Sequence, residues 1–500
     1  MTRKSAIIIG AGMGGLTAAV LLASHGYDVT VHEQHFRPGG LLHRFFREGS
    51  PYDTGFHYCG GVEHQDILGR CLRHLGVFEQ LQFQDLDPEG FDRLVYPGFE
   101  FKVPVGFEAY RQRLKETFPH EAHGIDLFMQ DMLNAIQEYG LYVYRTDVNV
   151  VEFLRWEGMS LEQAIDRRLR DPAIKAVLTG QCVLYGVPAN EAPFGLHSVI
   201  MHHFLRGAHR VVGGGDRLAK VMVQRIKALG GKVHLRSEVT QLLVEERTAV
   251  GVKLASGEEQ RADLVIGNLN PRVMLDLLPP KAVRKAYKSR VLDQRPGLAH
   301  LGAYIQIQGG APEIGNANIY RHYDLEPARS FDPITPDHCP FYFATAPGEG
   351  YPLPRKGHDV ILMLTSLPWD HVKEWAGTKT RERPQEYQDF KQSLVDSVVG
   401  ALLNDYPELR PRIQRVEGST GLTTQHYTRS PLGAMYGHYH SVDQMGKYRP
   451  SQVLRIRNFV QVGQGVFTPG VLGATLSAYY GCGFHLGLDR LLDELNATPD

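Results

Sequence analysis

Three glycines and one acid near the start of the chain have the spacing of a site for a phosphorylated nucleotide. Gly10, Gly12 and Gly15 follow the pattern G-x-G-x-x-G, and Glu33 follows 23 residues after the first of them. The first glycine allows a tight turn, the second lets the backbone approach a pyrophosphate, and the third lets a helix pack closely on a strand. An acid at this distance can accept hydrogen bonds from ribose hydroxyls. The spacing predicts a dinucleotide site.

Three elements must position these residues. The apolar run Ile7–Ile9 predicts a strand, the Ala- and Leu-rich segment after Gly15 predicts a helix, and residues 27–32 predict a second strand that ends at Glu33. The first turn of such a helix offers unpaired N–H groups and a partial positive charge to phosphate. The first part of the chain therefore has a β-α-β order.

Two later regions also have the pattern of a glycine turn that leads into a helix. Residues 211–217 lead into a helix whose apolar positions recur every three or four residues, and Gly230 and Gly231 should end it. Short strands are expected at 232–235, 239–244, 251–254 and 262–268. Near the end of the chain, residues 459–465 predict a strand and a glycine turn, followed by a helix over 475–488.

These patterns predict two interleaved domains, because 500 residues exceed one ordinary core. We expect a nucleotide-binding domain from residues 1–75, 207–290 and 450–500. Residues 76–206 and 291–449 would form a second domain lying over the cofactor.

Composition narrows the function classes. Lys and Arg total 54 against 55 Asp and Glu, so no charge excess points to nucleic acid as a partner. The five cysteines are scattered without C-x-x-C spacing, as in reduced cytoplasmic proteins. We see no signal peptide and no run of about 20 apolar residues. The expected location is cytoplasmic, with the protein soluble or peripheral to a membrane.

The motifs together resemble a known superfamily. Gly10 to Glu33, followed by Pro38, Gly39 and Gly40, resembles the cofactor segment of flavoproteins with the two-domain amine oxidase and phytoene desaturase fold. The glycine pair favours FAD over NAD, since it resembles the loop that passes under the extended cofactor. The resemblance implies an α/β fold: a doubly wound, Rossmann-like FAD-binding domain with an interleaved α+β substrate-binding domain.

Further segments are similar to the retinol saturase and carotenoid isomerase subgroup. They are residues 52–58, 185–188 with His197 and His203, 422–427, 431–437, and the pair Gly463-Gln464. This similarity implies an FAD-dependent oxidoreductase that acts on carbon–carbon double bonds of an apolar isoprenoid or polyene. It favours a saturase or cis–trans isomerase over a desaturase. Because such substrates reside in membranes, we also expect a peripheral membrane contact.

The resemblance also implies which residues contact FAD. They are Gly10, Gly12, Met13, Gly14, Gly15, Glu33, Gln34, Gly39, Gly40, Leu41, Val239, Gly463, Gln464, Val471 and Leu472. One departure is Arg44, because many desaturases have an arginine directly after the glycine pair, where Leu41 stands here. Arg44 is therefore a doubtful phosphate ligand.

His57 and Tyr58 are the candidate catalytic residues, because the resemblance puts their segment beside the flavin. An imidazole titrates near neutrality and could exchange a proton with the substrate, or it could only hydrogen-bond the backbone of its loop. Tyr58 could donate a phenolic proton, or pack as a wall of the pocket. The adjacent His202 and His203 point to different sides of a helix or strand, so no metal site is expected.

Two other functions stay open. An amine oxidase on the same fold would use aromatic side chains beside the flavin, and the segment 426–440 is rich in Tyr and His. We expect that segment to form a cavity wall. A protein that binds prenylated partners without redox chemistry is the third interpretation, and it predicts no stoichiometric flavin.

Overall fold

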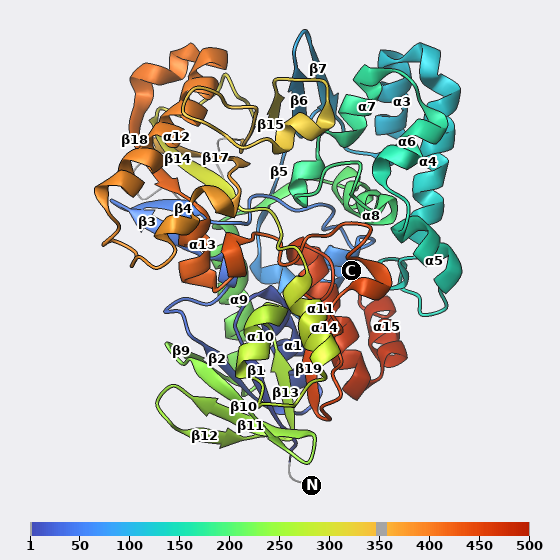
Figure 1. Cartoon of the computed structure of the whole chain (residues 1–500). Coiled ribbons are helices and arrows are strands. Elements are labelled where there is room, and N and C mark those ends of the chain that lie inside the picture. Colours follow the sequence, from blue (N-terminus) through green and yellow to red (C-terminus); the bar gives the residue numbers. More distant parts are fainter. Residues whose placement is uncertain (1–2, 347–357, 500) are drawn as a thin grey trace.

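The computed structural model describes residues 3–346 and 358–499. Two sheets organise them, one in the lower and one in the upper half of Figure 1. All five strands of the lower sheet are parallel, in the order β19-β13-β1-β2-β9. Their bounds are β1 Ser5–Ile9, β2 Asp28–Glu33, β9 Lys232–Leu235, β13 Leu264–Gly267 and β19 Phe459–Gln461.

Alternate residues of β1 show why this sheet is buried on both faces. Ala6 and Ile8 belong to one apolar cluster with helices α1 (Met13–Ser24), α9 (Gly214–Ala228) and α14 (Gly470–Leu486). Ile7 and Ile9 face a second cluster, formed with β10 (Val239–Glu245), β11 (Thr248–Leu254) and α10 (Pro271–Leu277). With β12 (Glu259–Arg261), β10 and β11 form an antiparallel sheet that covers that face.

The upper sheet is mixed and has seven strands, in the order β18-β14-β17-β16-β15-β6-β7. Their bounds are β6 Asp92–Tyr96, β7 Phe99–Val103, β14 His300–Gln308, β15 Asn318–His322, β16 Phe341–Ala344, β17 His358–Ser366 and β18 Ile413–Ser419. Two small sheets pair β3 (Arg44–Arg47) with β4 (Ser50–Asp53) and β5 (Phe83–Asp85) with β8 (His209–Val211). The predicted fold class is confirmed, whereas the domain boundaries stay a prediction.

A group of helices on the right of Figure 1 flanks the mixed sheet, and α12 packs on β14. The remaining bounds are α2 Ile67–His74, α3 Phe107–Thr117, α4 Ala122–Gln137, α5 Val150–Glu157, α6 Leu161–Arg168, α7 Pro172–Thr179, α8 Phe194–Leu205, α11 Lys285–Asp293, α12 Gln385–Asp405, α13 Gly421–Thr428 and α15 Leu488–Asn496. Across the described part of the chain, no helix combines the length and apolar character that crossing a membrane requires.

The last long helix differs from its prediction. It begins at Gly470, five residues before the predicted start, and ends at Leu486, after which Gly487 has φ +89° and α15 follows. Gly470 keeps a turn-like φ of +81° at the first position of the helix, whereas Gly473 lies inside the helix. A Cβ at Gly473 would lie 2.1 Å from the Thr468 carbonyl oxygen.

Candidate active site

A cleft of about 200 Å³ lies between the first glycine turn and the start of α14. Nine of the predicted cofactor residues line it: Gly12, Met13, Gly14, Gly39, Gly40, Leu41, Gly463, Gln464 and Val471. They come from segments far apart in sequence, because β1 and β19 both neighbour β13 in the parallel sheet. The carboxyl ends of parallel strands thus meet at one edge, where such folds bind ligands.

The glycine turn fits a phosphate group. A Cβ at Gly15 would lie 2.1 Å from the Gly10 carbonyl oxygen, and one at Gly14 would lie 2.8 Å from the side-chain amide of Asn268. Gly12 begins α1 with no side-chain cap, and the first turn holds no acid. The positive dipole end of α1 therefore faces the cleft and can attract an anion.

Glu33 ties the end of β2 to this turn. Its carboxylate accepts the backbone N–H of Ala11 at 2.7 Å and that of His35 at 2.8 Å. Burial raises the pKa of the Glu33 carboxyl, and these backbone bonds oppose that shift. Each carboxylate oxygen keeps acceptor capacity beyond its one backbone bond, so the predicted ribose contact is compatible with the geometry.

The second glycine pair also has the required backbone. Gly39 and Gly40 have φ of +116° and +59°, and the Gly39 N–H donates to the Ala11 carbonyl at 2.7 Å. The loop is thereby held against the first turn. Arg44, in contrast, is buried and its Nε lies 2.6 Å from Asp53 Oδ1, so its charge is directed to that carboxylate.

Six predicted cofactor residues do not line the cleft: Gly10, Gly15, Glu33, Gln34, Val239 and Leu472. Gln34 accepts a hydrogen bond from Arg429 Nε at 3.1 Å. Val239 begins β10, and its side chain packs in the apolar cluster of Ile7 and Ile9. Any contact of Val239 with a cofactor would therefore use its backbone, and both roles stay predictions.

The start of α14 closes the other side of the cleft. Gln464 donates to the Met435 carbonyl at 2.8 Å and accepts the Gly470 N–H at 3.4 Å. The N-cap residue Pro469 makes no side-chain bond to the helix, so the positive dipole end of α14 can face an electron-rich ring edge. Val471 faces the cleft and also a second, larger cavity, which Leu472 lines as well.

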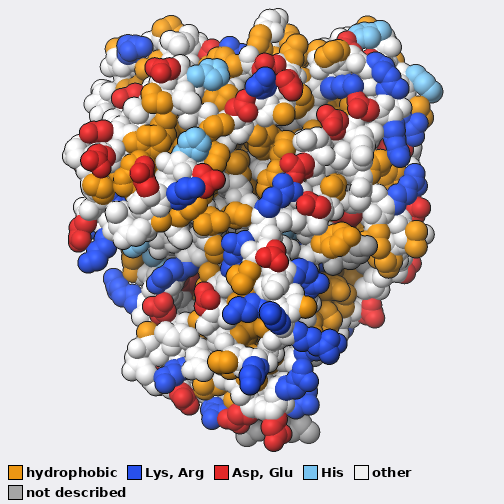
Figure 2. Space-filling view, viewed as in Figure 1, with side chains coloured by type: hydrophobic (Ala, Val, Ile, Leu, Met, Phe, Trp, Pro, Cys, Tyr) orange, Lys and Arg blue, Asp and Glu red, His pale blue; other side chains and the backbone are white. Residues whose placement is uncertain are grey.

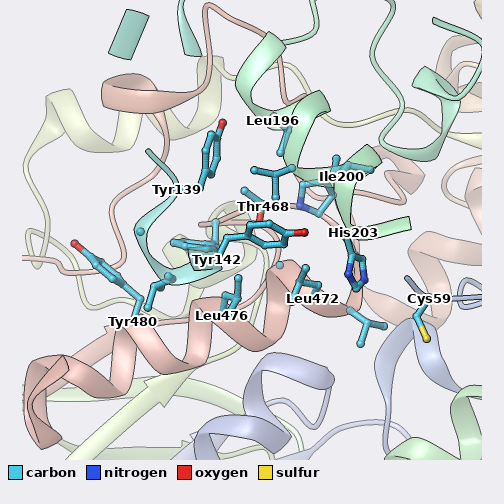
Figure 3. A pocket seen from close by; sticks show the side chains of 18 of the residues that line it. Cys59, Tyr139, Tyr142, Leu196, Ile200, His203, Thr468, Leu472, Leu476 and Tyr480 are labelled. Carbon is cyan, nitrogen blue, oxygen red and sulfur yellow. The ribbon is translucent and has the colours of Figure 1, made fainter. Parts of the chain in front are cut away.

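This second cavity measures about 530 Å³ and is mostly apolar. It runs along α14 and under α8, with Tyr139 and Tyr480 at one end and His203 and Cys59 at the other (Figure 3). From Leu472 to Tyr480 the helix advances about 12 Å, at 1.5 Å per residue. The volume and lining of the cavity are those of a site for a small apolar molecule. It shares Gly55, Tyr436, Gly470 and Val471 with the cleft.

His57 lies where this cavity meets a smaller one of about 70 Å³. Both of its ring nitrogens are buried without a hydrogen-bond partner. The interpretation in which His57 bonds the backbone therefore does not describe this structure. Burial lowers the pKa of His57 to about 4, and a similar effect lowers that of the neighbouring His300. A neutral imidazole thus faces the cavity.

Tyr58 lines the same two cavities, yet its hydroxyl points into a buried polar network. It donates to Asp92 Oδ2 and contacts the Tyr320 hydroxyl, both at 2.8 Å. Gln181 and Asn318 donate to the same carboxylate. This arrangement supports the interpretation of Tyr58 as a wall.

The other sequence candidates separate into different surroundings. His202 contacts the Tyr142 hydroxyl at 2.7 Å, whereas His203 accepts the Gly60 N–H at 3.2 Å, so the two rings serve different neighbours. His197 lies 2.9 Å from the Tyr185 hydroxyl in the core. In the described residues, no cluster of three metal-ligating side chains occurs.

The segment 426–440 is only partly a cavity wall. Tyr436 lines both cavities and the cleft, as expected. Tyr427 instead packs against His35 and His43, beside the end of β2. The expectation was wrong for Tyr427, because α13 turns it toward the first β-α-β unit rather than the cavity.

Sequence reasoning missed Asn268, which follows β13 directly. Its side chain lies under the glycine turn and, with the amide turned to satisfy its neighbours, accepts the N–H groups of Gly12 and Gly15 at 3.2 and 3.3 Å. A polar residue at the end of a buried parallel strand was the available signal.

The model of one protein family covers almost the whole chain. The family described as flavin containing amine oxidoreductase matches residues 13–482. The chain belongs to this family. It is a flavin-dependent oxidoreductase, and the glycine turns, Glu33 and the first turn of α14 fit that cofactor.

Individual proteins of known name and structure are also similar to this flavin oxidoreductase. It is 27% identical to the all-trans-retinol 13,14-reductase of Danio rerio, over 95% of this chain and 84% of that protein. It is 25% identical to the 4,4'-diapophytoene desaturase of a Methylomonas species, over 92% and 91%. An oxidoreductase structure from Methanosarcina mazei shares the fold, with a TM-score of 0.64 at 16% identity over 95% of this chain and 99% of that one.

Proposed function

We propose that this flavin oxidoreductase binds FAD and acts on a carbon–carbon double bond of a long apolar polyene, carotenoid- or retinoid-like. The observation that carries the proposal is the apolar cavity of about 530 Å³ that adjoins the cofactor cleft. Relatives named for retinol reduction and diapophytoene desaturation support the same substrate class. Of the possible outcomes we favour saturation or cis–trans isomerisation over desaturation.

The site has one part suited to an adenosine and a pyrophosphate and another suited to a flavin ring, which favours FAD over a flavin mononucleotide. Glu33 and the glycine turn are suited to an adenosine and a pyrophosphate. The first turn of α14, on the far side of the cleft, is suited to the ring. When bound, the flavin supplies hydride transfer at its N5 position.

His57 would manage the proton. Its neutral ring is held at the junction of the two cavities, and its two nitrogens have no competing partner. Such a neutral ring can accept a proton on its unprotonated nitrogen and, as the imidazolium so formed, pass it to a substrate carbon without first breaking a hydrogen bond. The ring of Phe343 lies 5.9 Å from it, centroid to centroid, and helps to exclude water.

The amine oxidase interpretation fits the cavity less well. In the described lining of the large cavity, the acidic side chain is Glu138, and its carboxylate accepts the Asn149 N–H at 2.8 Å. At the His57 end, no described lining residue is an acid that could contact an ammonium group, and Asp53, the carboxylate that acts on His57, is paired with Arg44. The non-catalytic escort interpretation conflicts with the intact glycine turn and Glu33.

We also propose that α5 delivers the substrate from a membrane surface. Val148 and Phe153 line the cavity, while Val150 and Val151 beside them are 61% and 74% exposed. Figure 2 shows hydrophobic side chains on the right of this face, where Figure 1 labels α5. An exposed apolar group next to an apolar cavity is the arrangement expected of an entrance for a lipid-like molecule.

The test follows the absorbance of the flavin, which changes when the cofactor is reduced or reoxidised. The cofactor is released from purified protein and identified, and the oxidised enzyme is then mixed anaerobically with amines. The reduced enzyme is mixed with retinoids and carotenoids. Reoxidation or isomerisation with a polyene is expected. Bleaching by an amine would establish the amine oxidase interpretation, and a colourless protein that FAD cannot reconstitute would establish the escort interpretation.

A further inference from the structure

The large cavity has a charged end. Figure 3 shows Tyr139 and Tyr480 at the end opposite His203 and Cys59. Arg449 belongs to this end, because its guanidinium lies 4.7 Å from the centroid of the Phe467 ring and is electrostatically coupled to both tyrosines. Arg449 and Phe467 both line the cavity. The large cavity, which is mostly apolar, therefore has a guanidinium at this end.

The donors of Arg449 are not used by the protein. In the described part of the chain, we find no hydrogen bond or ion pair of its guanidinium. The nearest acid that affects it is Glu157, whose carboxylate accepts the Tyr139 hydroxyl and is not within ion-pair distance of Arg449. A cation held in an apolar wall without a bonded partner is costly, and its five N–H groups are suited to a planar anion.

The second arginine of the lining is different. Arg145 is exposed and its Nε lies 3.0 Å from Asp147 Oδ1, so it already has an acid. Its charge is also screened by water. Arg449 is less exposed than Arg145, and in the described lining it is the guanidinium that has no acid partner.

We propose that Arg449 binds a carboxylate at the end of the polyene substrate, with two parallel N–H···O bonds. The inference rests on the proposed function, since it places the apolar chain along α14 and the reacting double bond near His57. A fixed carboxylate would select which double bond reaches that end, because the anchor sets how far the chain extends along the helix. Fork-to-fork pairing of this kind is both strong and specific in geometry.

Binding rather than turnover tests the proposal. The flavoprotein is titrated with all-trans-retinoic acid, its methyl ester and all-trans-retinol, by calorimetry. These probes share one polyene and differ at its end. We expect the acid to bind at least tenfold more tightly than the ester, because charge-assisted hydrogen bonds are lost in the ester. Arg449→Gln should remove this preference and leave the affinity for the ester unchanged, whereas Arg449→Lys should keep part of it.

Arg155→Gln is the matched control. Arg155 also lies over an aromatic ring, Trp156 at 4.8 Å, but it is exposed and paired with Glu152 outside the cavity. Its substitution should keep the preference. Equal affinities for acid and ester in the natural protein, or a preference that survives Arg449→Gln, would overturn the role of Arg449 alone. Failure of all three polyenes to bind would contradict the proposed function as well.

Discussion

The hydroxyl of Tyr58 donates to a carboxylate oxygen of Asp92 at 2.8 Å, so one wall of the substrate cavity is anchored to a buried acid. Asp92 is fully buried, and burial raises its pKa from 3.8 to about 7. Asn318, Gln181 and Tyr58 donate to it and limit that rise. The cavity wall thus depends on a group that titrates near neutrality.

This burial predicts a pH-dependent stability. Between about pH 4 and pH 7 the folded protein keeps a proton on Asp92 that the unfolded chain has released. Stability contributed by Asp92 therefore falls as the pH rises through that window, by at most about 1.4 kcal/mol per pH unit. The free energy of unfolding, measured by denaturant for the natural protein minus Asp92→Asn, should decline from pH 4 to 7 and then level. Parallel curves would contradict the assignment.

His57→Gln should separate cofactor binding from turnover. We expect unchanged flavin content and a kcat/KM lowered about 100-fold, the usual size of a positioned proton donor or acceptor. Because the pKa of His57 is about 4, its ring is uncharged from pH 5 to 8 and charges only as the pH falls through about 4. The titration of His57 should therefore add no inflection near pH 6.5 to the pH profile of kcat/KM. In that range the profiles of the natural protein and the variant should have the same shape. Unchanged turnover would remove His57 from the mechanism.

Glu33→Ala should weaken FAD retention. The substitution removes the acceptor for Ala11 and His35 and the predicted ribose contact, so the dissociation constant of FAD should rise at least tenfold, or about 1.4 kcal/mol. Dialysis followed by the flavin-to-protein absorbance ratio measures this. Glu245→Ala is the control, because Glu245 is exposed and pairs at the surface with Arg261. Full retention of FAD by Glu33→Ala would show that the contact is dispensable.

Acids placed on α5 should abolish membrane contact. We expect the natural protein to float with liposomes and the Val150→Asp, Val151→Asp double variant to stay in the soluble fraction, because two charges oppose insertion of this apolar group. Leu292→Asp, on α11, introduces a charge at another site that is 46% exposed and should leave flotation intact. Flotation that the double variant retains would assign the contact to another surface.

The sequence predicts those parts of the site that a local residue pattern determines. The G-x-G-x-x-G turn, Glu33 and the Gly39-Gly40 loop follow from residue types that one backbone conformation requires. Asn268 was missed because its role depends on β13 lying next to β1, which is a tertiary fact. Arg449 lies where Glu157 of α5 and Tyr480 of α14 act on its charge, and no spacing in the chain indicates this position. The partner of Tyr58 is likewise 34 residues away.

The most direct test of the central claim is the mass of the product after one anaerobic turnover. Enzyme with fully reduced flavin is mixed with an equimolar all-trans polyene that carries a terminal carboxylate. The products are separated, and their molecular masses are measured by mass spectrometry. Saturation predicts reoxidised flavin and a product two hydrogens heavier, and isomerisation predicts unchanged mass with flavin still reduced. A polyene recovered with its original mass and geometry, beside flavin that stays reduced, would contradict the claim that this enzyme acts on carbon–carbon double bonds.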